Sequence, residues 1–418
     1  MAIVQLNSTN PKFSFLIKKN PETGMLLRAV RQGIAYGWYS DEVTFNVYFK
    51  DADNDVSFKR DQNETFEYLN VSRYNTPLFP LSAINEFFSS PLKEQDEEGY
   101  KHTFFINLIH IERVRYITFF QKHMKDYTIT IEQQANKSYS LTVSTEKSLY
   151  HLLHTVSVMC LFLSVMGNEY IDISEPVLDK YIRSINVIDA PFFIRSLFAR
   201  NLLTTRERFK KYKAYIEQTA RYEMTLEYGG TATQRRSYIS SVLAFDKPIL
   251  DLGCGEGFYA ISYAGKVDGM YYAVDINEEL LEVVKRKAES KGIENIVTYN
   301  SLDHFLESYS HDTVDVILTE VIEHMSEDEA GAFIRKIFES VTFDRLIITT
   351  PNADFNRYYE LDGFRHDDHK WEMSKLAFEQ WIIRLLQDYP CQYSFAAIGD
   401  SVEDIHTTQG IIISKKEE

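Results

Sequence analysis

Apolar and polar residues alternate in three stretches of the first third of the chain, which predicts β-strands with one buried face. These stretches are residues 43–49, 127–132 and 140–144. The short polar segment between the second and third stretches predicts that they form a hairpin. Helices are predicted for residues 81–88, 146–166 and 176–228.

After Gly229 and Gly230 the pattern changes to short apolar runs that alternate with amphipathic helices. The runs are residues 248–252, 270–274, 314–318 and 346–350, and the helices include 259–264 and 278–291. This alternation predicts a doubly wound parallel sheet of the α/β class. Two late runs, residues 393–398 and 409–414, are close enough to pair as an antiparallel hairpin at its edge.

The chain therefore divides into two predicted domains. Residues 1–225 form a mixed α+β module, in which an internal boundary near residue 145 is compatible with the pattern. Residues 226–418 form the doubly wound domain. A length of 418 residues is ample for two or three hydrophobic cores.

The net charge of −16 argues against a protein that coats nucleic acid with its whole surface, although a local basic groove remains compatible with it. Ten Lys and Arg residues from position 195 to position 236 form either a solvated helix face or an RNA-binding stripe. Residues 149–166 are apolar but include two histidines, so we expect a buried core helix and no membrane span. Three widely separated cysteines and the absence of a visible signal peptide predict a cytoplasmic protein with reduced thiols.

A glycine-rich string, Asp251-Leu-Gly-Cys-Gly-Glu-Gly257, joins the first strand of the doubly wound domain to a helix. Such a string fits a structural turn, a dinucleotide site or another nucleotide-like cofactor. Asp251 precedes the glycines and can meet an amine-bearing ligand. Asp275 ends the next strand, where a carboxylate can accept both hydroxyls of a ribose.

These two motifs resemble those of class I S-adenosylmethionine-dependent methyltransferases. The resemblance implies that Asp251, Gly253 and Gly255 line the methionine part of the cofactor and that Asp275 holds its ribose. The segment that follows the third strand resembles the adenine-contacting one. It implies cofactor contacts for Ser301 and Asp303.

Carboxylates and imidazoles follow the next two strands. Glu320-Val-Ile-Glu-His324 comes directly after residues 314–318, and His366 and His369 follow the strand that ends near Asn352. Adjacent parallel strands bring these groups to one edge of the sheet. A mixed nitrogen and oxygen donor set suits Mn²⁺, Mg²⁺, Co²⁺ or Fe²⁺ better than a thiolate-rich zinc site does. The first string alone also occurs in methyltransferases that use no metal there.

Together with Thr349-Thr-Pro-Asn352 and the string from Phe364 to Glu372, the site resembles the HEN family of RNA 3′-terminal ribose 2′-O-methyltransferases. The resemblance implies one divalent cation, Mn²⁺ or Mg²⁺, bound by four ligands: Glu320, Glu323, His324 and His369. Trp371 and Met373 replace the family's usual phenylalanine and tryptophan and keep the positions apolar. Weaker patches at residues 15–20 and 68–74 resemble the N-terminal module of bacterial members. They imply a partnership with a polynucleotide kinase–phosphatase–ligase.

A ribose 2′-hydroxyl is a poor nucleophile, and a cation that contacts the 2′ and 3′ oxygens would lower its pKa and orient it. The expected substrate is therefore RNA with a free 2′,3′-OH terminus. We expect Glu323 and His369 to act in catalysis and His366 to serve as a general base or outer group. Arg365 and Lys370 are candidates for contacts with terminal phosphates.

Two alternatives remain open from the sequence. A small-molecule O-methyltransferase of the same fold would have no need for His369. The N-terminal half could instead act mainly as a scaffold for RNA-repair enzymes.

Overall fold

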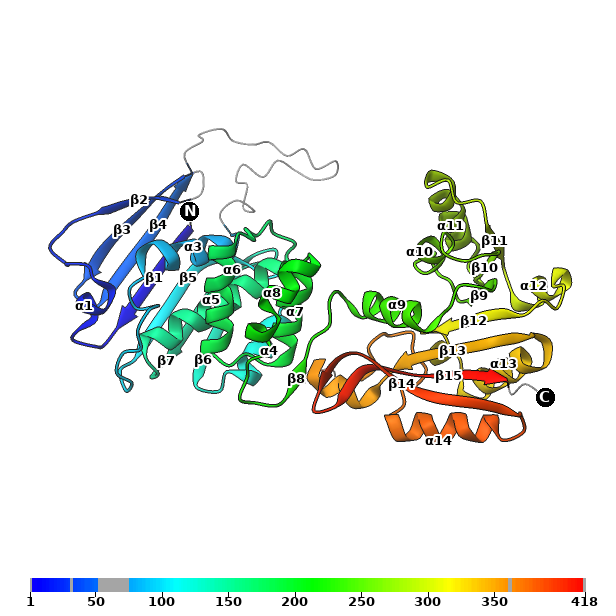
Figure 1. The fold of residues 1–418 in the computed structure, drawn as a ribbon. Helices are drawn as coiled ribbons and strands as arrows, with labels where there is room; N and C mark the ends of the chain where they lie inside the picture. The colour runs from blue at the N-terminus through cyan, green and yellow to red at the C-terminus, as the bar shows by residue number, and fades with distance from the viewer. Residues whose placement is uncertain (1, 31–32, 52–74, 360–362, 416–418) are drawn as a thin grey trace. The chain divides into compact units, whose positions relative to one another are not determined.

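The computed structural model describes residues 2–30, 33–51, 75–359 and 363–415. It divides the chain into two compact units, residues 1–203 with 214–220 and residues 204–213 with 221–418. Figure 1 shows the helices and strands of both units. The patch of sequence resemblance at residues 68–74 lies outside the described residues.

The N-terminal unit is built on a seven-stranded sheet with the order β2-β3-β4-β1-β5-β7-β6 and antiparallel neighbours (Figure 1). Its strands are β1 (Ala2–Ser8), β2 (Leu26–Val30), β3 (Gly33–Asp41), β4 (Thr44–Asp51), β5 (His102–His110), β6 (Tyr127–Ala135) and β7 (Ser138–Thr145). The three predicted strands overlap β4, β6 and β7, and β6 pairs with β7 as the predicted hairpin. These predictions are confirmed, whereas β1, β2, β3 and β5 were not predicted.

Helices cover this sheet and complete the unit. They are α1 (Phe13–Ile17), α3 (Leu78–Phe87), α4 (Arg115–His123), α5 (Leu149–Met166), α6 (Glu175–Val187) and α7 (Phe192–Leu202). Helix α8 (Arg206–Ile216) lies at the division between the units. The helical region predicted for residues 176–228 is therefore three helices that end at Ile216. The prediction is wrong for residues 217–228, which contain no helix and include a short strand at residues 224–225.

Helix α5 begins at a capping residue, Ser148, whose hydroxyl accepts from the backbone N–H of His151. Its length and apolar composition would suit a membrane span, yet 78% of it is buried within the structure. His154 on this helix is 2% exposed and its Nδ1 lies 2.8 Å from the hydroxyl oxygen of Ser184. Burial lowers the pKa of His154 to about 4, so the ring is neutral in the core. The prediction of a buried core helix is confirmed.

The C-terminal unit is an eight-stranded sheet with the order β11-β10-β9-β12-β13-β15-β14-β8 (Figure 1). Its strands are β8 (Met224–Thr225), β9 (Ile249–Leu252), β10 (Tyr271–Val274), β11 (Ile296–Tyr299), β12 (Val314–Thr319), β13 (Phe343–Pro351), β14 (Cys391–Val402) and β15 (Ile405–Lys415). Strands β9 to β13 pair in parallel, and β15 and β14 add the antiparallel edge. The predicted doubly wound sheet with its edge hairpin is confirmed. The short strand β8 extends that edge and was not predicted.

Helices and two 3₁₀ turns connect these strands. They are α9 (Thr231–Val242), α10 (Ala260–Tyr263), α11 (Glu278–Ser290), α12 (Leu302–Ser308), η1 (Ile322–His324), α13 (Glu327–Ser340), η2 (Ala353–Tyr359) and α14 (Lys375–Leu386).

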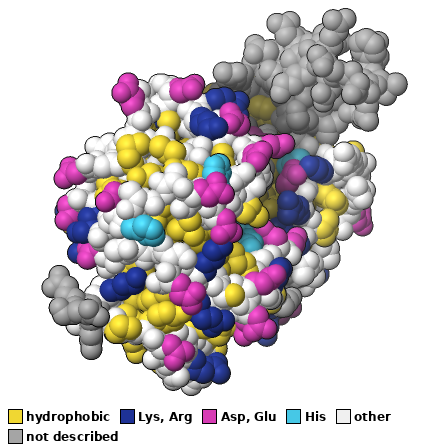
Figure 2. Space-filling view, turned by 90° about the vertical axis from the view of Figure 1, so that its right-hand side faces the viewer, with side chains coloured by type: hydrophobic (Ala, Val, Ile, Leu, Met, Phe, Trp, Pro, Cys, Tyr) yellow, Lys and Arg dark blue, Asp and Glu magenta, His cyan; other side chains and the backbone are white. Residues whose placement is uncertain are grey.

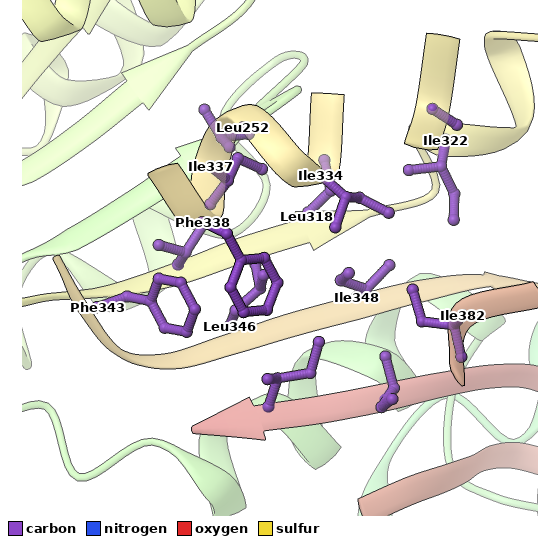
Figure 3. Packing of buried hydrophobic residues seen from close by; sticks show 14 of the residues in the cluster. Leu252, Leu318, Ile322, Ile334, Ile337, Phe338, Phe343, Leu346, Ile348 and Ile382 are labelled. Carbon is purple, nitrogen blue, oxygen red and sulfur yellow. The ribbon is translucent and has the colours of Figure 1, made fainter. Parts of the chain in front are cut away.

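The core between α13 and the central strands fixes the position of η1. Figure 3 shows Ile334 and Ile337 of α13 above Leu318 of β12 and Ile348 of β13, all of them buried. Each such side chain contributes about 2 kcal/mol by leaving water. Helix α13 begins with a capping box in which Ser326 and Glu329 exchange hydrogen bonds, so both ends of η1 are anchored.

Acidic and basic side chains are mixed on the face of the molecule drawn in Figure 2. Two of the cationic residues in the stretch from 195 to 236 point inward. Arg195 is fully buried and donates to the backbone carbonyls of Ala190 and Ile216. Arg235 forms an ion pair with Glu320. These two residues therefore belong neither to a solvated helix face nor to an exposed RNA-binding stripe.

Candidate active site

The glycine loop after β9 adopts a backbone that only glycine tolerates easily. Gly253 has a φ of +77°, and an added Cβ would lie 2.3 Å from Cγ2 of Val321. Gly255 has a φ of +53°, and an added Cβ there would meet nothing within 4 Å. The loop thus touches the Glu320–His324 segment on one side and leaves open space at Gly255.

Asp251 is 1% exposed at the end of β9. The hydroxyl of Tyr271 donates to its Oδ2 at 2.8 Å, whereas its Oδ1 has no hydrogen-bond donor among the described residues. Burial, with a smaller contribution from Asp275, raises the pKa of Asp251 to about 7. A buried acceptor with one free oxygen suits a ligand that brings its own donor, such as an amino group.

Asp275 lies at the carboxyl end of β10 and receives two backbone hydrogen bonds. The N–H of Gly255 donates to its Oδ2 at 2.8 Å, and the N–H of Asn277 donates to its Oδ1 at 2.9 Å. The next residue, Ile276, is an apolar side chain that is 90% exposed. Ile276 was not predicted as a site residue, although an isoleucine directly after the ribose-binding candidate is an apolar surface available to a cofactor ring.

The predicted adenine segment has structural partners of its own. Ser301 caps α12, because its hydroxyl accepts from the N–H of His304 at 3.1 Å. Asp303 is exposed and forms an ion pair with Lys336 of α13. These contacts explain both side chains without a ligand, so their cofactor role stays a prediction.

Three predicted ligands lie together where η1 meets the loop after β13. One donor atom each from Glu323, His324 and His369 lie within 4.8 Å of one another. The backbone joins the two segments, since the N–H of Lys370 donates to the carbonyl of Glu323 at 2.8 Å. Residues more than forty positions apart in the sequence are therefore held at one point.

Glu323 is fully buried within this group. The hydroxyl of Thr350 donates to its Oε2 at 3.1 Å, while its Oε1 has no donor among the described residues. Burial and the neighbouring carboxylate of Glu320 raise the pKa of Glu323 well above its ordinary value. A buried carboxylate with an unused oxygen beside two imidazoles fits a divalent cation, because the cation would compensate the buried charge.

Glu320 is not part of this three-residue group. Its Oε1 accepts from the hydroxyl of Thr349 at 3.2 Å, and its Oε2 lies 3.3 Å from Nη1 of Arg235. Its backbone is in the left-handed region, with a φ of +54°. The structure thus brings together three of the four predicted ligands and places the fourth carboxylate in an ion pair.

Glu372 is a site residue to which the sequence analysis gave no role. Its side chain is fully buried, and its Oε1 lies 2.6 Å from Nδ1 of His369. The backbone N–H of Arg365 also donates to Oε1, at 2.7 Å. This carboxylate fixes the imidazole so that Nε2 is the nitrogen left for a cation. The spacing of three residues between His369 and Glu372 was a signal available in the sequence.

The other candidates differ in exposure. His366 is exposed, with its ring centroid 5.1 Å from that of His369. Arg365 donates to the side chain of Asn356 and to the carbonyl of Asn352. Lys370 is exposed and lies 3.4 Å from a carboxylate oxygen of Glu329. Arg365 therefore holds the loop together in this structure, whereas His366 and Lys370 face solvent.

Comparison with known proteins defines the class of the C-terminal unit. Residues 249–342 match the family model described as "Methyltransferase domain", and methyltransferases of this fold use S-adenosylmethionine. Residues 3–221, more than half of the chain, match the model described as "Hen1 N-terminal domain". The chain belongs to the Hen1 family.

Curated relatives match over the C-terminal part of the chain. A small RNA 2′-O-methyltransferase of Mus musculus is 26% identical over 179 residues, covering 40% of this chain and 45% of the relative. One of Drosophila melanogaster is 29% identical over 172 residues, covering 37% and 43%. The match thus spans less than half of the length of these relatives.

A solved structure shares the fold of the whole chain. It is described as "Structure of the Pnkp1/Rnl/Hen1 RNA repair complex" and matches with a TM-score of 0.80 at 23% identity. The match covers 99% of this chain and all of the other. The similarity shows that the fold of this chain also occurs in that solved structure.

Proposed function

We propose that the protein is an S-adenosylmethionine-dependent RNA methyltransferase that modifies the 2′-hydroxyl of a 3′-terminal nucleotide with the help of one divalent cation. The observation that carries the proposal is the group formed by Glu323, His324 and His369 beside the glycine loop. Membership of the Hen1 family and similarity to small RNA 2′-O-methyltransferases support it.

The proposed cation would be held by carboxylate oxygens and imidazole nitrogens. Glu323, His324 and His369 are the proposed ligands whose donor atoms lie close together, and Glu320 is the proposed fourth. A bound Mn²⁺ or Mg²⁺ would supply a Lewis acid for the terminal ribose oxygens, and S-adenosylmethionine would supply the methyl group. Thr350 and Glu372 hold Glu323 and His369 in fixed orientations, which favours a defined geometry for the terminal ribose.

His366 is the proposed general base. Its ring is exposed and lies next to that of His369, so it can take a proton from a hydroxyl and release it to water. Asp251 and Asp275 are the proposed cofactor contacts, together with the backbone of Gly253 and Gly255. The Gly253–Val321 contact places the cofactor loop directly against the segment that carries Glu320 and Glu323.

Methyl transfer from labelled cofactor to short RNAs tests this proposal. We expect transfer to RNA that ends in 2′,3′-OH and none to RNA that ends in a 2′-deoxynucleotide or a 3′-phosphate. We also expect EDTA to abolish transfer and Mn²⁺ to restore it. Transfer that survives chelation would contradict the role of the cation, and transfer to a catechol-type small molecule in place of RNA would favour the small-molecule alternative.

We further propose that the protein works in the cytoplasm with a polynucleotide kinase–phosphatase–ligase, bound through the N-terminal unit. Three free cysteines fit a reducing compartment. The match of residues 3–221 and the similarity to a chain of an RNA-repair complex support the partnership. Co-elution of the full chain with such an enzyme tests it, and a C-terminal fragment, residues 221–418, that co-elutes equally well would contradict it.

A further inference from the structure

A pocket of about 110 Å³ lies in the N-terminal unit, lined by residues of α3, α5 and α6 and of the segment that follows α3. Helices α3 and α6 both pack against α5 (Figure 1). Leu81, Leu92 and Tyr181 form the apolar part of the wall. The pocket has room for several water molecules or for a small chemical group such as a phosphate. No residue of the proposed active site lines it.

The polar groups at the buried end of this pocket already have hydrogen-bond partners. Nδ1 of His154 lies 2.8 Å from Oγ of Ser184, and Nε2 lies 3.3 Å from the carbonyl oxygen of Leu92. The hydroxyl of Ser157 donates to the carbonyl of Leu153 at 2.7 Å. A ligand would therefore gain little from hydrogen bonds at the buried end, and the groups that select it are those at the exposed end.

Three cations line the exposed end of the pocket: Lys93 after α3, and Lys180 and Arg183 on α6. No carboxylate among the described residues lines the pocket. Lys137 and Lys147 of the same unit each form an ion pair with an acidic side chain, whereas these three cations form none in the part of the chain that the structure describes. In a chain with a net charge of −16, such a local excess of positive charge attracts an anion.

The number and kind of these cations favour a phosphate over a carboxylate. A phosphate monoester carries a charge of about −1.5 to −2 at neutral pH and has three strong acceptor oxygens, whereas a carboxylate has one charge and two oxygens. The guanidinium of Arg183 can bind two phosphate oxygens at once, and Lys93 and Lys180 can each add a charge-assisted hydrogen bond. The apolar wall beside them suits the organic part of an ester, which inorganic phosphate lacks.

We propose that this pocket binds the phosphate monoester of a nucleotide, either a free mononucleotide or the 5′-terminal nucleotide of an RNA. The three cations would hold the phosphate, and the apolar wall would contact the attached nucleoside. The choice of a nucleotide over a phosphorylated peptide rests on the proposed function, because that function requires the chain to meet RNA. The pocket would give the N-terminal unit a ligand of its own, in addition to the proposed partner enzyme.

Calorimetric titration of the full chain with uridine 5′-monophosphate tests the pocket, with uridine and inorganic phosphate as matched ligands. Uridine compounds are chosen because an adenosine compound could also enter the cofactor site. Lys180→Gln and Arg183→Gln each remove one charge at an exposed position, so both variants should fold normally. Lys125→Gln is the matched control, because Lys125 is an exposed lysine of the same unit that does not line the pocket.

We expect the wild-type chain to bind uridine 5′-monophosphate at least about tenfold more tightly than uridine, since the phosphate adds charge-assisted hydrogen bonds. Inorganic phosphate should also bind more weakly than the mononucleotide. Lys180→Gln and Arg183→Gln should each weaken binding of the mononucleotide about fivefold to tenfold, and Lys125→Gln should change it by less than about twofold. Equal binding of the mononucleotide and uridine, or an equal loss in Lys125→Gln and Lys180→Gln, would contradict the proposal.

Short RNAs with a 5′-phosphate or a 5′-hydroxyl separate the two sources of the phosphate. A preference of the wild type for the 5′-phosphorylated RNA that is lost in Lys180→Gln would support the RNA end as the ligand. Binding of the mononucleotide without that preference would support the free nucleotide. A phosphoserine peptide that binds when neither nucleotide probe does would contradict the proposal.

These titrations need neither cofactor nor methyl transfer, so the pocket and the proposed function can fail separately. Binding of the mononucleotide by a chain that transfers no methyl group to RNA would support the pocket and contradict the proposed function. Methyl transfer to RNA by a chain that binds neither the mononucleotide nor the 5′-phosphate would contradict the pocket alone.

Discussion

Nδ1 of His369 lies 2.6 Å from Oε1 of Glu372, a carboxylate that is fully buried. The pair leaves Nε2 of the imidazole as the nitrogen that can bind a cation. Because metal-binding histidines depend on such partners for orientation and basicity, Glu372 is a positioning residue of the proposed site.

Glu372→Gln should weaken Mn²⁺ binding about 10- to 100-fold. The amide keeps the shape of the side chain. Because it is neutral, it accepts a weaker hydrogen bond from the imidazole of His369 and makes that ring less basic. Isothermal titration with Mn²⁺ in the absence of RNA measures the effect. Glu327→Gln, at an exposed position of α13, is the matched control and should leave the affinity within about twofold. Equal affinities of the two variants would contradict the positioning role.

Glu323→Ala should abolish methyl transfer while cofactor binding persists. The substitution removes the buried carboxylate that lies beside His324 and His369, whereas the glycine loop makes no hydrogen bond to it. Single-turnover assays and cofactor titration measure the two properties separately. Loss of cofactor binding together with activity would show that Glu323 supports the fold, and the ligand assignment would then be wrong.

Comparison of Gly253→Ala with Gly255→Ala should separate the effect of backbone strain from the effect of a steric clash with Val321. Both positions have positive φ, which costs about 1 kcal/mol for a residue with a Cβ. At Gly253 the new methyl group would also collide with Val321, whereas at Gly255 it would enter open space. We expect thermal unfolding to show a clearly larger loss of stability for Gly253→Ala. Gly255→Ala should keep most of its stability and lose cofactor affinity.

Asp251 predicts a pH dependence of stability in the cofactor-free protein. Its pKa is raised from the ordinary 3.8 to about 7 in the folded chain, so the folded state binds this proton more tightly than the unfolded state. The contribution of Asp251 to the free energy of unfolding therefore falls as the pH rises from about 4 to about 7. Denaturant unfolding of the wild type and of Asp251→Asn, which does not titrate, measures it. A difference in stability between them that stays constant across this range would contradict the raised pKa.

The doubly wound sheet was predictable because its buried strands are short apolar runs bounded by glycine and polar residues. The strand that carries Asp251 and the edge hairpin were both predicted from that pattern. In the N-terminal unit, β5 was missed because its residues 103–106, Thr-Phe-Phe-Ile, interrupt the alternation, and β3 was missed because it contains glycines at 33 and 37. Strands in which apolar and polar residues do not alternate cannot be recognised by a period of two residues.

The residues of the candidate site could be predicted from the sequence, but most of the contacts between them could not. Motif spacing indicated Glu323, His324 and His369, but it could not reveal the ion pair between Arg235 and Glu320. Arg235 lies 85 positions before Glu320, and only the three-dimensional fold brings the two together. Glu372 was within reach of the sequence, because it lies only three residues after His369.

Glu320 keeps a left-handed backbone that a glycine would adopt without strain. Glu320→Gly would relieve this strain, but it would also leave the guanidinium of Arg235, whose side chain is only 13% exposed, without its carboxylate. Arg235 thus holds a strained glutamate at the position where a fourth ligand is proposed.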